Sequence, residues 1–217
     1  MANQFNKSKR TKINRLPARG YYDKETIYKI IDETYFCHVS FISDDQPFII
    51  PTIHARINDK IVLHGAKSSR LLKHISAGNE VCIAFTLMDG LVLARSVFHH
   101  SINYRSVVLF GKGREVINKK EKVNAFQAIS DHIKPGRWED ARQPNQKEID
   151  ATTVVLINIE EASAKIRTGP PMDDEEDYQL PVWAGVIPVH LKSDKPERDP
   201  ELAENILLPG YIENFQD

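Results

Sequence analysis

The sequence is poor in cysteine, in long apolar runs and in net charge. Of its 217 residues only Cys37 and Cys82 are cysteines, and both lie in apolar runs, so we expect buried, reduced thiols and no disulfide framework. No stretch approaches the roughly 20 apolar residues of a membrane helix, and the N-terminus carries no secretory signal pattern. A net charge of −1 argues against general nucleic-acid binding. We therefore expect a cytoplasmic protein without a membrane or nucleic-acid partner.

The common signatures of nucleotide loops and hydrolytic sites are also missing. No strand leads into Gly-x-x-x-x-Gly-Lys-Ser/Thr, and no Gly-x-Gly-x-x-Gly opens a helix. Gly111 and Gly113 lie within an expected strand, where a bulge explains them better than a nucleotide loop. Ser101 beside His100 lacks a nucleophile elbow. We assign no catalytic residue.

A metal site is not expected either. His99 and His100 are neighbours in an expected strand, so their side chains would point to opposite faces. No carboxylate or cysteine lies near them in the sequence to complete a ligand set.

What is present is an ordinary globular composition, with 41% hydrophobic and 27% charged residues. We expect a mobile basic arm over residues 1–18, one domain over residues 19–168, and a C-terminal extension over residues 169–217. The extension is rich in proline, and we expect it to pack on the domain or on a dimer partner.

Hydrophobic periodicity predicts a mainly β domain with three flanking helices. One helix begins after Asp23, one after Ser68 or Ser69, and one carries Val123 and Phe126. The expected strands cover residues 35–42, 47–54, 61–65, 80–88, 91–94, 104–117 and 152–167. Successive strands have connections too short for helical crossovers, so the sheet should be antiparallel. We expect a β-barrel with flanking helices, of the six-stranded split kind.

The sharpest local signal is the segment His64-Gly65-Ala66-Lys67-Ser68-Ser69-Arg70. A strand end, two hydroxyls, two cations and the free N–H groups of a helix start could converge there on a phosphate. Alternatively, a serine only caps the helix and the two cations are solvated.

Two further segments concentrate functional groups. Residues 89–107 hold two arginines, two histidines and an asparagine between strands, which is typical of a buried network or a pocket lining. Trp183 lies among small and apolar residues, which suits core or dimer packing or a cover over a cofactor ring.

Taken together, several short motifs resemble the FMN-binding split-barrel family related to pyridoxamine 5′-phosphate oxidase, on the branch of the nitroimidazole-resistance and flavin-nucleotide-binding proteins. The residues that carry the resemblance are Arg19-Gly20-Tyr21-Tyr22-Asp23, Pro51-Thr52, His64-Gly65, Ser69-Arg70, Asp89-Gly90-Leu91-Val92, Asn103-Tyr104-Arg105-Ser106-Val107 with Gly111, and Trp183-Ala184-Gly185. The resemblance implies an FMN cofactor and a homodimer with FMN sites at the subunit interface.

The same resemblance implies a set of cofactor-binding positions. They are Pro51, Thr52, Ile53, His64, Gly65, Lys67, Ser68, Ser69, Arg70, Asn103, Arg105 and Ser106. Ser106 stands where the oxidases carry a glutamine, and their C-terminal tryptophan and arginine have no convincing match here. Oxidation of vitamin B6 is therefore disfavoured.

Two functions remain as expectations. The first is an FMN-dependent oxidoreductase that acts on a small organic molecule such as a nitro compound or quinone, with Arg105 as the cation near the flavin. The second is a non-catalytic haem- or flavin-binding protein of the same fold, in which His64 or His100 would ligate iron.

Overall fold

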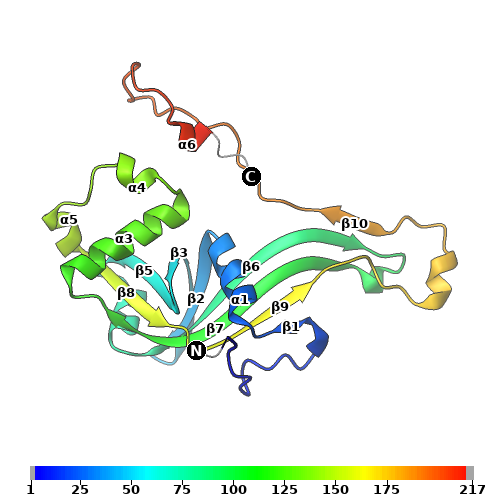
Figure 1. Ribbon diagram of the computed structural model, residues 1–217. Coiled ribbons are helices and arrows are strands. Elements are labelled where there is room, and N and C mark those ends of the chain that lie inside the picture. The colour runs from blue at the N-terminus through cyan, green and yellow to red at the C-terminus, as the bar shows by residue number, and fades with distance from the viewer. Residues whose placement is uncertain (1–2, 214–217) are drawn as a thin grey trace.

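The computed structural model describes residues 3–213 and is built around an open, antiparallel β-sheet (Figure 1). The strands are β1 (Gly20–Tyr21), β2 (Phe36–Ser43), β3 (Gln46–Ile53), β4 (Ala55–Ile57), β5 (Lys60–Ala66), β6 (Glu80–Leu93), β7 (Ser101–Glu115), β8 (Thr152–Asn158), β9 (Glu161–Arg167) and β10 (Gly185–Pro188). They run in the order β3-β2-β6-β7-β8-β5-β4, while β9 joins β7 to β1 and β10 pairs with β6. The expected mainly β, antiparallel split-barrel class is confirmed, with more strands than the six expected.

Short helices flank the sheet. The α-helices are α1 (Lys24–Glu33), α2 (Arg70–Ser76), α3 (Lys119–Ile133), α4 (Arg137–Asp140), α5 (Gln146–Ala151) and α6 (Gly210–Glu213), and the 3-10 helices are η1 (Pro17–Arg19), η2 (Val97–His99) and η3 (Glu175–Gln179). The three expected helices are α1, α2 and α3. Asp23 caps α1 by accepting from the Thr26 N–H at 2.8 Å, as its position in the sequence predicts.

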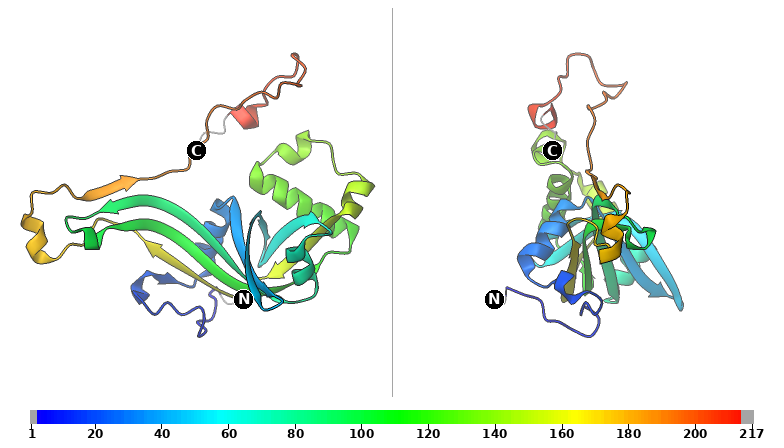
Figure 2. Two further views of the ribbon diagram at one scale, coloured as in Figure 1. Left: turned by 180° about the vertical axis from the view of Figure 1, so that it is seen from behind. Right: turned by 90° about the vertical axis from the view of Figure 1, so that its right-hand side faces the viewer.

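The core lies on the face of the sheet that α1 covers. Strand residues such as Val39, Phe85 and Leu109 are fully buried there against Ile27 and Ile31 of α1. A second, smaller cluster forms where α3 packs on β4, β5 and β8. Helices α1 and α3 thus cover different parts of the curved sheet, with α3 at one end and α1 nearer the middle (Figures 1 and 2).

Strand β7 belongs to two parts of the sheet, which explains its glycines. Its first part pairs with β9 and its last part, from Gly113, pairs with β8. A Cβ atom on Gly111 would lie 1.9 Å from the Asn158 carbonyl oxygen, so only glycine fits the crossing. The expectation of one strand over residues 152–167 is wrong, because β8 and β9 separate at this crossing. The irregularity in the β6–β7 pairing lies between Met88 and Gly90 and not at Gly111.

The N-terminal segment is packed on the sheet, in contrast to the mobile arm expected from its composition. Phe5 and Thr11 are buried, and the Arg10 guanidinium donates to both Glu80 and Glu161. The pKa of Glu80 is lowered because it accepts these charged hydrogen bonds. Residues 1 and 2 of the expected arm lie outside the described residues.

The C-terminal extension leaves the sheet after β10 and ends in α6, which lies near α4 (Figure 2). Before β10, Trp183 is two-thirds exposed, and its ring lies against Gly185, where a Cβ atom would be only 2.9 Å away. Both cysteines are free, Cys37 buried and Cys82 half-buried. Over residues 3–213, no helix combines the length and the apolar character needed to cross a membrane.

Candidate functional site

The segment from His64 to Arg70 joins the end of β5 to the start of α2. Ser69 caps α2 by accepting from the Leu72 N–H at 3.4 Å, so the capping interpretation is correct for this serine. Lys67 and Ser68 are exposed. The Arg70 guanidinium lies 4.5 Å above the Phe48 ring and, among the described residues, has no carboxylate partner. The segment therefore keeps two cations available for an anion.

His64 has an unusual environment at the base of this segment. Its imidazole is half-buried beside the Phe126 ring, and its buried Nδ1 atom has no hydrogen-bond partner among the described residues. Burial lowers the pKa of His64, so the ring is held in its neutral form. A neutral imidazole without a partner on one nitrogen has a lone pair to offer.

Strand β3 carries the next group of expected residues. Pro51, Thr52 and Ile53 pair with β2 near the end of β3, and Ile53 is 43% exposed. The contact between Arg70 and Phe48 connects this strand to the segment at residues 64–70. Two of the three expected groups therefore lie on elements that are in contact at Phe48, three residues before Pro51.

The third expected group, on β7, is already engaged in hydrogen bonds within the chain. Asn103 donates to the Gly169 carbonyl at 3.1 Å, and Ser106 donates to the Lys165 carbonyl at 3.2 Å. Arg167, which is buried, donates to the Asn103 side chain and to the Gly169 carbonyl at 3.3 Å. These bonds attach the start of β7 to the chain that follows β9.

Arg105 is held between two carboxylates. It donates to Asp89 at 2.8 Å and to Glu33, the last residue of α1, at 2.7 Å. The pKa of Arg105 is raised and that of Glu33 lowered by these hydrogen bonds. Its guanidinium is therefore neutralised, unlike that of Arg70. Within the described chain, no hydrogen bond or ion pair joins Arg105 to residues 64–70.

The opposite face of the sheet from the core is apolar as well. Strand register places nine exposed apolar residues on this one face: Phe36, Ile42, Ile49, Ile53, Met88, Leu91, Ile102, Val108 and Ile187. We call this set the outer face. The signal was available in residues 47–50, Pro-Phe-Ile-Ile, since a strand with apolar residues at successive positions is typical of a sheet covered on both sides.

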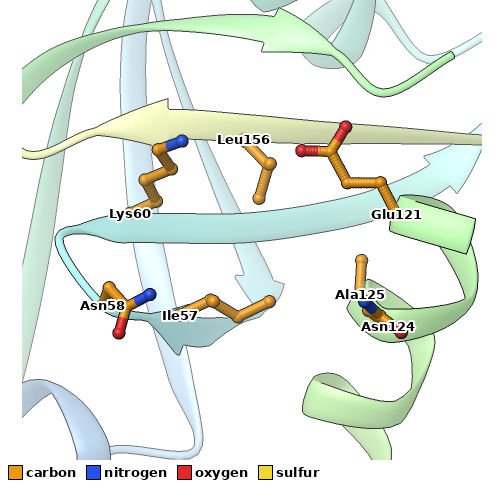
Figure 3. A pocket seen from close by; sticks show the side chains of 7 residues that line it. All are labelled: Ile57, Asn58, Lys60, Glu121, Asn124, Ala125 and Leu156. Carbon is orange, nitrogen blue, oxygen red and sulfur yellow. The ribbon is translucent and has the colours of Figure 1, made fainter. Parts of the chain in front are cut away.

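A small pocket lies between β4, β5 and α3 (Figure 3). Its volume is about 240 Å³, and its lining consists of Ile57, Asn58, Lys60, Glu121, Asn124, Ala125 and Leu156. None of the expected cofactor-binding residues lines it.

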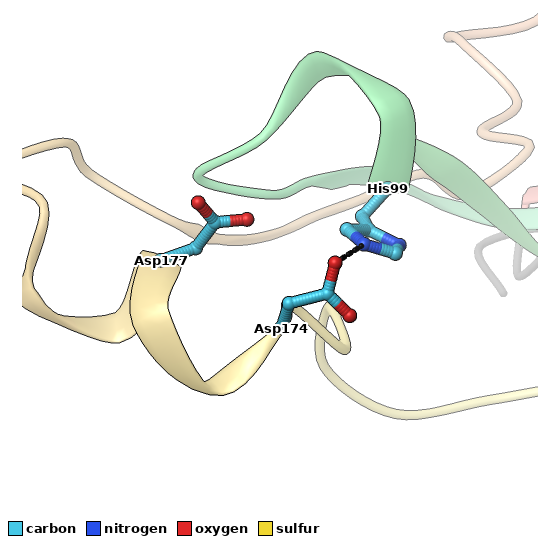
Figure 4. A group of neighbouring side chains, drawn as sticks. All are labelled: His99, Asp174 and Asp177. Atoms are coloured by element: carbon cyan, nitrogen blue, oxygen red, sulfur yellow. Dashed lines mark hydrogen bonds and ion pairs between the residues drawn. The ribbon is translucent and has the colours of Figure 1, made fainter.

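At the far end of the β6–β7 hairpin, His99 lies beside two carboxylates from η3 and the residue before it (Figure 4). Its Nε2 atom is 3.3 Å from Asp174, and possible ligand atoms of His99, Asp174 and Asp177 lie within 4.8 Å of one another. The sequence contains no carboxylate close to His99, and the inference that none lies near it in the structure is wrong. Asp174, which is 75 residues later in the chain, is its hydrogen-bond partner. His99 also belongs to η2 and not to a strand. The hydrogen bond between His99 and Asp174 accounts for this partly exposed group.

One buried histidine has no solvent contact. His54 packs against the Phe85 ring and its Nε2 lies 3.0 Å from the Ile31 carbonyl, at the end of α1. Burial lowers the pKa of His54 from 6.5 to about 4, so this ring is neutral at physiological pH.

The antiparallel split barrel defines the fold class of this chain. A family model described as pyridoxamine 5′-phosphate oxidase matches residues 23–166. This chain belongs to that family. No curated protein sequence matches it.

Three solved structures are similar to the chain. The flavocytochrome Anf3 from Azotobacter vinelandii is 39% identical, with a TM-score of 0.90, and the similarity covers 96% of this chain and 97% of that one. The FAD and haem binding protein from Mycobacterium smegmatis is 29% identical, with a TM-score of 0.87, over 91% and 97% of the two chains. A putative 5-nitroimidazole antibiotic resistance protein from Bacteroides thetaiotaomicron is 22% identical, with a TM-score of 0.58, over 68% and 86%, which shows the fold alone.

Proposed function

We propose that this protein binds a flavin and a haem and transfers electrons between them and a small molecule. The observation that carries the proposal is the similarity to the flavocytochrome Anf3, 39% identical over nearly the full length of both chains. A flavin supplies one- or two-electron transfer and a haem one-electron transfer, while the protein supplies binding, orientation and electrostatics.

The flavin phosphate would bind to the segment at residues 64–70. Lys67 and Arg70 lack carboxylate partners among the described residues, and the Ser68 hydroxyl is exposed beside them. FMN and FAD both carry a phosphate on the ribityl chain, so this segment could hold either. The sequence resemblance favours FMN, whereas the name of the mycobacterial relative mentions FAD. Chromatography of the flavin released from the purified protein distinguishes the two.

Loss of a cation from this segment tests the flavin site. We expect Arg70→Ala and Lys67→Ala each to weaken flavin binding by about 1.5–3 kcal/mol, the range for a charge-assisted hydrogen bond. Lys73→Ala is the matched control, because Lys73 is also exposed and lies further along α2. Unchanged flavin affinity in both Arg70→Ala and Lys67→Ala, measured by fluorescence titration, would exclude this site.

Of the two histidines expected as haem ligands, His64 fits better than His100. The Nδ1 atom of His100 accepts the Ala94 N–H at 3.2 Å, so in the neutral ring the other nitrogen carries the proton and has no lone pair for iron. His64 has an unpartnered nitrogen and a lowered pKa, both of which suit a neutral ligand. We therefore propose His64 as an axial ligand.

The absorption spectrum of the purified protein tests the haem. Haem gives an intense Soret band, and we expect His64→Ala to shift or abolish it while the flavin bands remain. The same spectrum recorded for His38→Ala, His74→Ala, His100→Ala and His190→Ala serves as comparison. A normal Soret band in His64→Ala, with the band lost in another variant, would assign iron binding to that other histidine.

We further propose that the protein is a homodimer that pairs through the outer face. Exposed apolar patches of this extent mark interaction sites, and a two-fold dimer is the commonest symmetric solution. The outer face carries Ile53 of the expected cofactor set, so a partner packed there would lie beside the flavin. This position supports the expectation of a cofactor at the subunit interface.

The reaction proposed is oxidation or reduction of a small organic molecule of the nitro or quinone class. Steady-state assays that combine nicotinamide donors with nitroaromatic and quinone acceptors test it. Turnover that depends on added flavin would support an oxidoreductase, and a loaded protein without turnover would leave a cofactor-binding role.

A further inference from the structure

The strap, which we define as residues 189–209, connects β10 to α6, and hydrogen bonds attach it to its own chain near its two ends. At the first end, the Val189 N–H donates to the Asp89 carbonyl at 3.1 Å. Just beyond the second end, the Tyr211 hydroxyl donates to Asp140 of α4 at 2.7 Å, and its ring lies beside Gly136. Figures 1 and 2 show the strap standing away from the sheet between these attachments.

Between its ends, the side-chain hydrogen bonds of the strap join strap residues to one another. The Arg198 guanidinium donates to the Ile206 carbonyl at 2.9 Å and to the Ala203 carbonyl at 2.5 Å, both within the strap. Every residue from 191 to 208 is exposed. Leu191 and Leu207 are 83% and 81% exposed, so the chain itself buries little of their apolar surface.

The composition of the strap indicates what kind of molecule it contacts. It contains three basic and five acidic residues, so no single sign of charge favours a nucleic acid or an anionic membrane. Its apolar residues gather near the second end, in the run Ile206-Leu207-Leu208. An apolar run within a segment of mixed charge is typical of a protein–protein contact with a polar rim.

The position of the strap favours a second copy of this chain as that protein. The strap follows directly on β10, the edge strand that contributes Ile187 to the outer face. A second copy packed on the outer face would therefore lie alongside the start of the strap. The apolar residues of the strap, Leu191 and residues 206–208, are then available to that second copy.

We propose that the strap wraps the partner subunit of the homodimer and contacts it through Leu191 and residues 206–208. This inference rests on the proposed homodimer. It assigns part of the dimer's stability to a segment outside the barrel, and the attachment of Tyr211 to α4 holds the far end of the strap in place.

Dimer dissociation measured by sedimentation equilibrium tests the strap. In the full-length chain, the double variant Leu207→Asp and Leu208→Asp should raise the dissociation constant at least about tenfold, as expected for loss of an apolar anchor. Lys195→Ala, an exposed change in the same strap, should leave it unchanged. A variant that ends after Pro188 should show an equal or larger effect.

Photo-crosslinking identifies the molecule in contact. A benzophenone side chain placed at position 207 should give a product of twice the chain mass. The role of the strap would be contradicted, and the homodimer left intact, by either of two results. One is an unchanged dissociation constant in both the double leucine variant and the truncated variant. The other is crosslinks only within one chain. A full-length protein that is monomeric at micromolar concentration would overturn the homodimer itself.

Discussion

The two faces of the central sheet are built from the same kinds of residues and differ in what covers them. On the inner face, Phe85 and Val107 pair across β6 and β7 and are fully buried beneath α1. On the outer face, the neighbouring pair Ala84 and Val108 leaves Val108 37% exposed, and Ile49 is 66% exposed. Apolar character alone therefore does not locate the core of this chain. The inner face is the core because helices of the same chain pack on it.

The largest effect should come from the inner face. Phe85→Ala removes a fully buried ring and should lower the free energy of unfolding by about 3–5 kcal/mol. Val108→Ala on the outer face is the control and should change the stability of the monomer by less than about 1 kcal/mol. Urea unfolding measures both, and similar losses would contradict the difference between the two faces.

The buried His54 should make the stability of the inner region depend on pH. Its folded-state pKa of about 4 lies below the ordinary value of 6.5, so the unfolded chain takes up the proton first as the pH falls. The stabilisation that the neutral His54 ring provides is complete above about pH 6.5 and is lost as the pH falls toward 4. We expect a loss of about 2 kcal/mol between about pH 7.5 and pH 5. His54→Gln should flatten this slope, and an equal slope in both proteins would exclude His54 as the cause.

A charge on the outer face should disturb assembly and leave folding intact. Ile53→Asp should raise the dimer dissociation constant about tenfold, or about 1.4 kcal/mol, because it buries an unpaired carboxylate in the interface. Its urea unfolding, extrapolated to a dilute monomer, should match that of the parent. Light scattering across a dilution series measures the effect, and Lys165→Ala provides a polar control on the same side of the sheet. A dimer as tight as the parent would place the interface elsewhere.

The smallest effect is expected at Arg105, where the inner face ends. Both carboxylate partners are partly exposed, so Arg105→Ala should cost about 1 kcal/mol or less of stability. The pKa of Glu33 should return upward when its charged donor is lost. Thermal shifts with and without flavin separate two roles. An unchanged shift on flavin addition would show that Arg105 holds α1 to the sheet, and a reduced shift would show a role at the cofactor.

Local patterns in the sequence are sufficient to predict most of the helices and strands and the class of fold. The cap at Asp23, the strand expected over residues 35–42 and the short connections between strands each depend on neighbouring residues, and the structure contains all three. The break between β8 and β9 was missed because it depends on Gly111, which lies about fifty residues earlier in the chain. A crossing of strands leaves little trace in either strand alone.

The candidate site could be predicted only in part for the same reason. The cations and hydroxyls of residues 64–70 are neighbours in the sequence, so their clustering was visible there. The carboxylates that neutralise Arg105 come from Glu33 and Asp89, and the sequence contains no local sign that they meet. Charge composition identifies a cation, but only the three-dimensional structure shows whether it is already paired.

The docking of the N-terminal segment has a consequence for the order of folding during synthesis. Arg10 is bonded to Glu161, 151 residues away, and β1 pairs with β9. Because β9 leaves the ribosome late, the first twenty residues must wait, with Phe5 exposed, until most of the chain has been made. Closing so long a loop is slow, since its entropy is lost before the contact forms. The N-terminal segment should therefore dock in the last phase of folding, and it is the part of the nascent chain most open to proteases and chaperones.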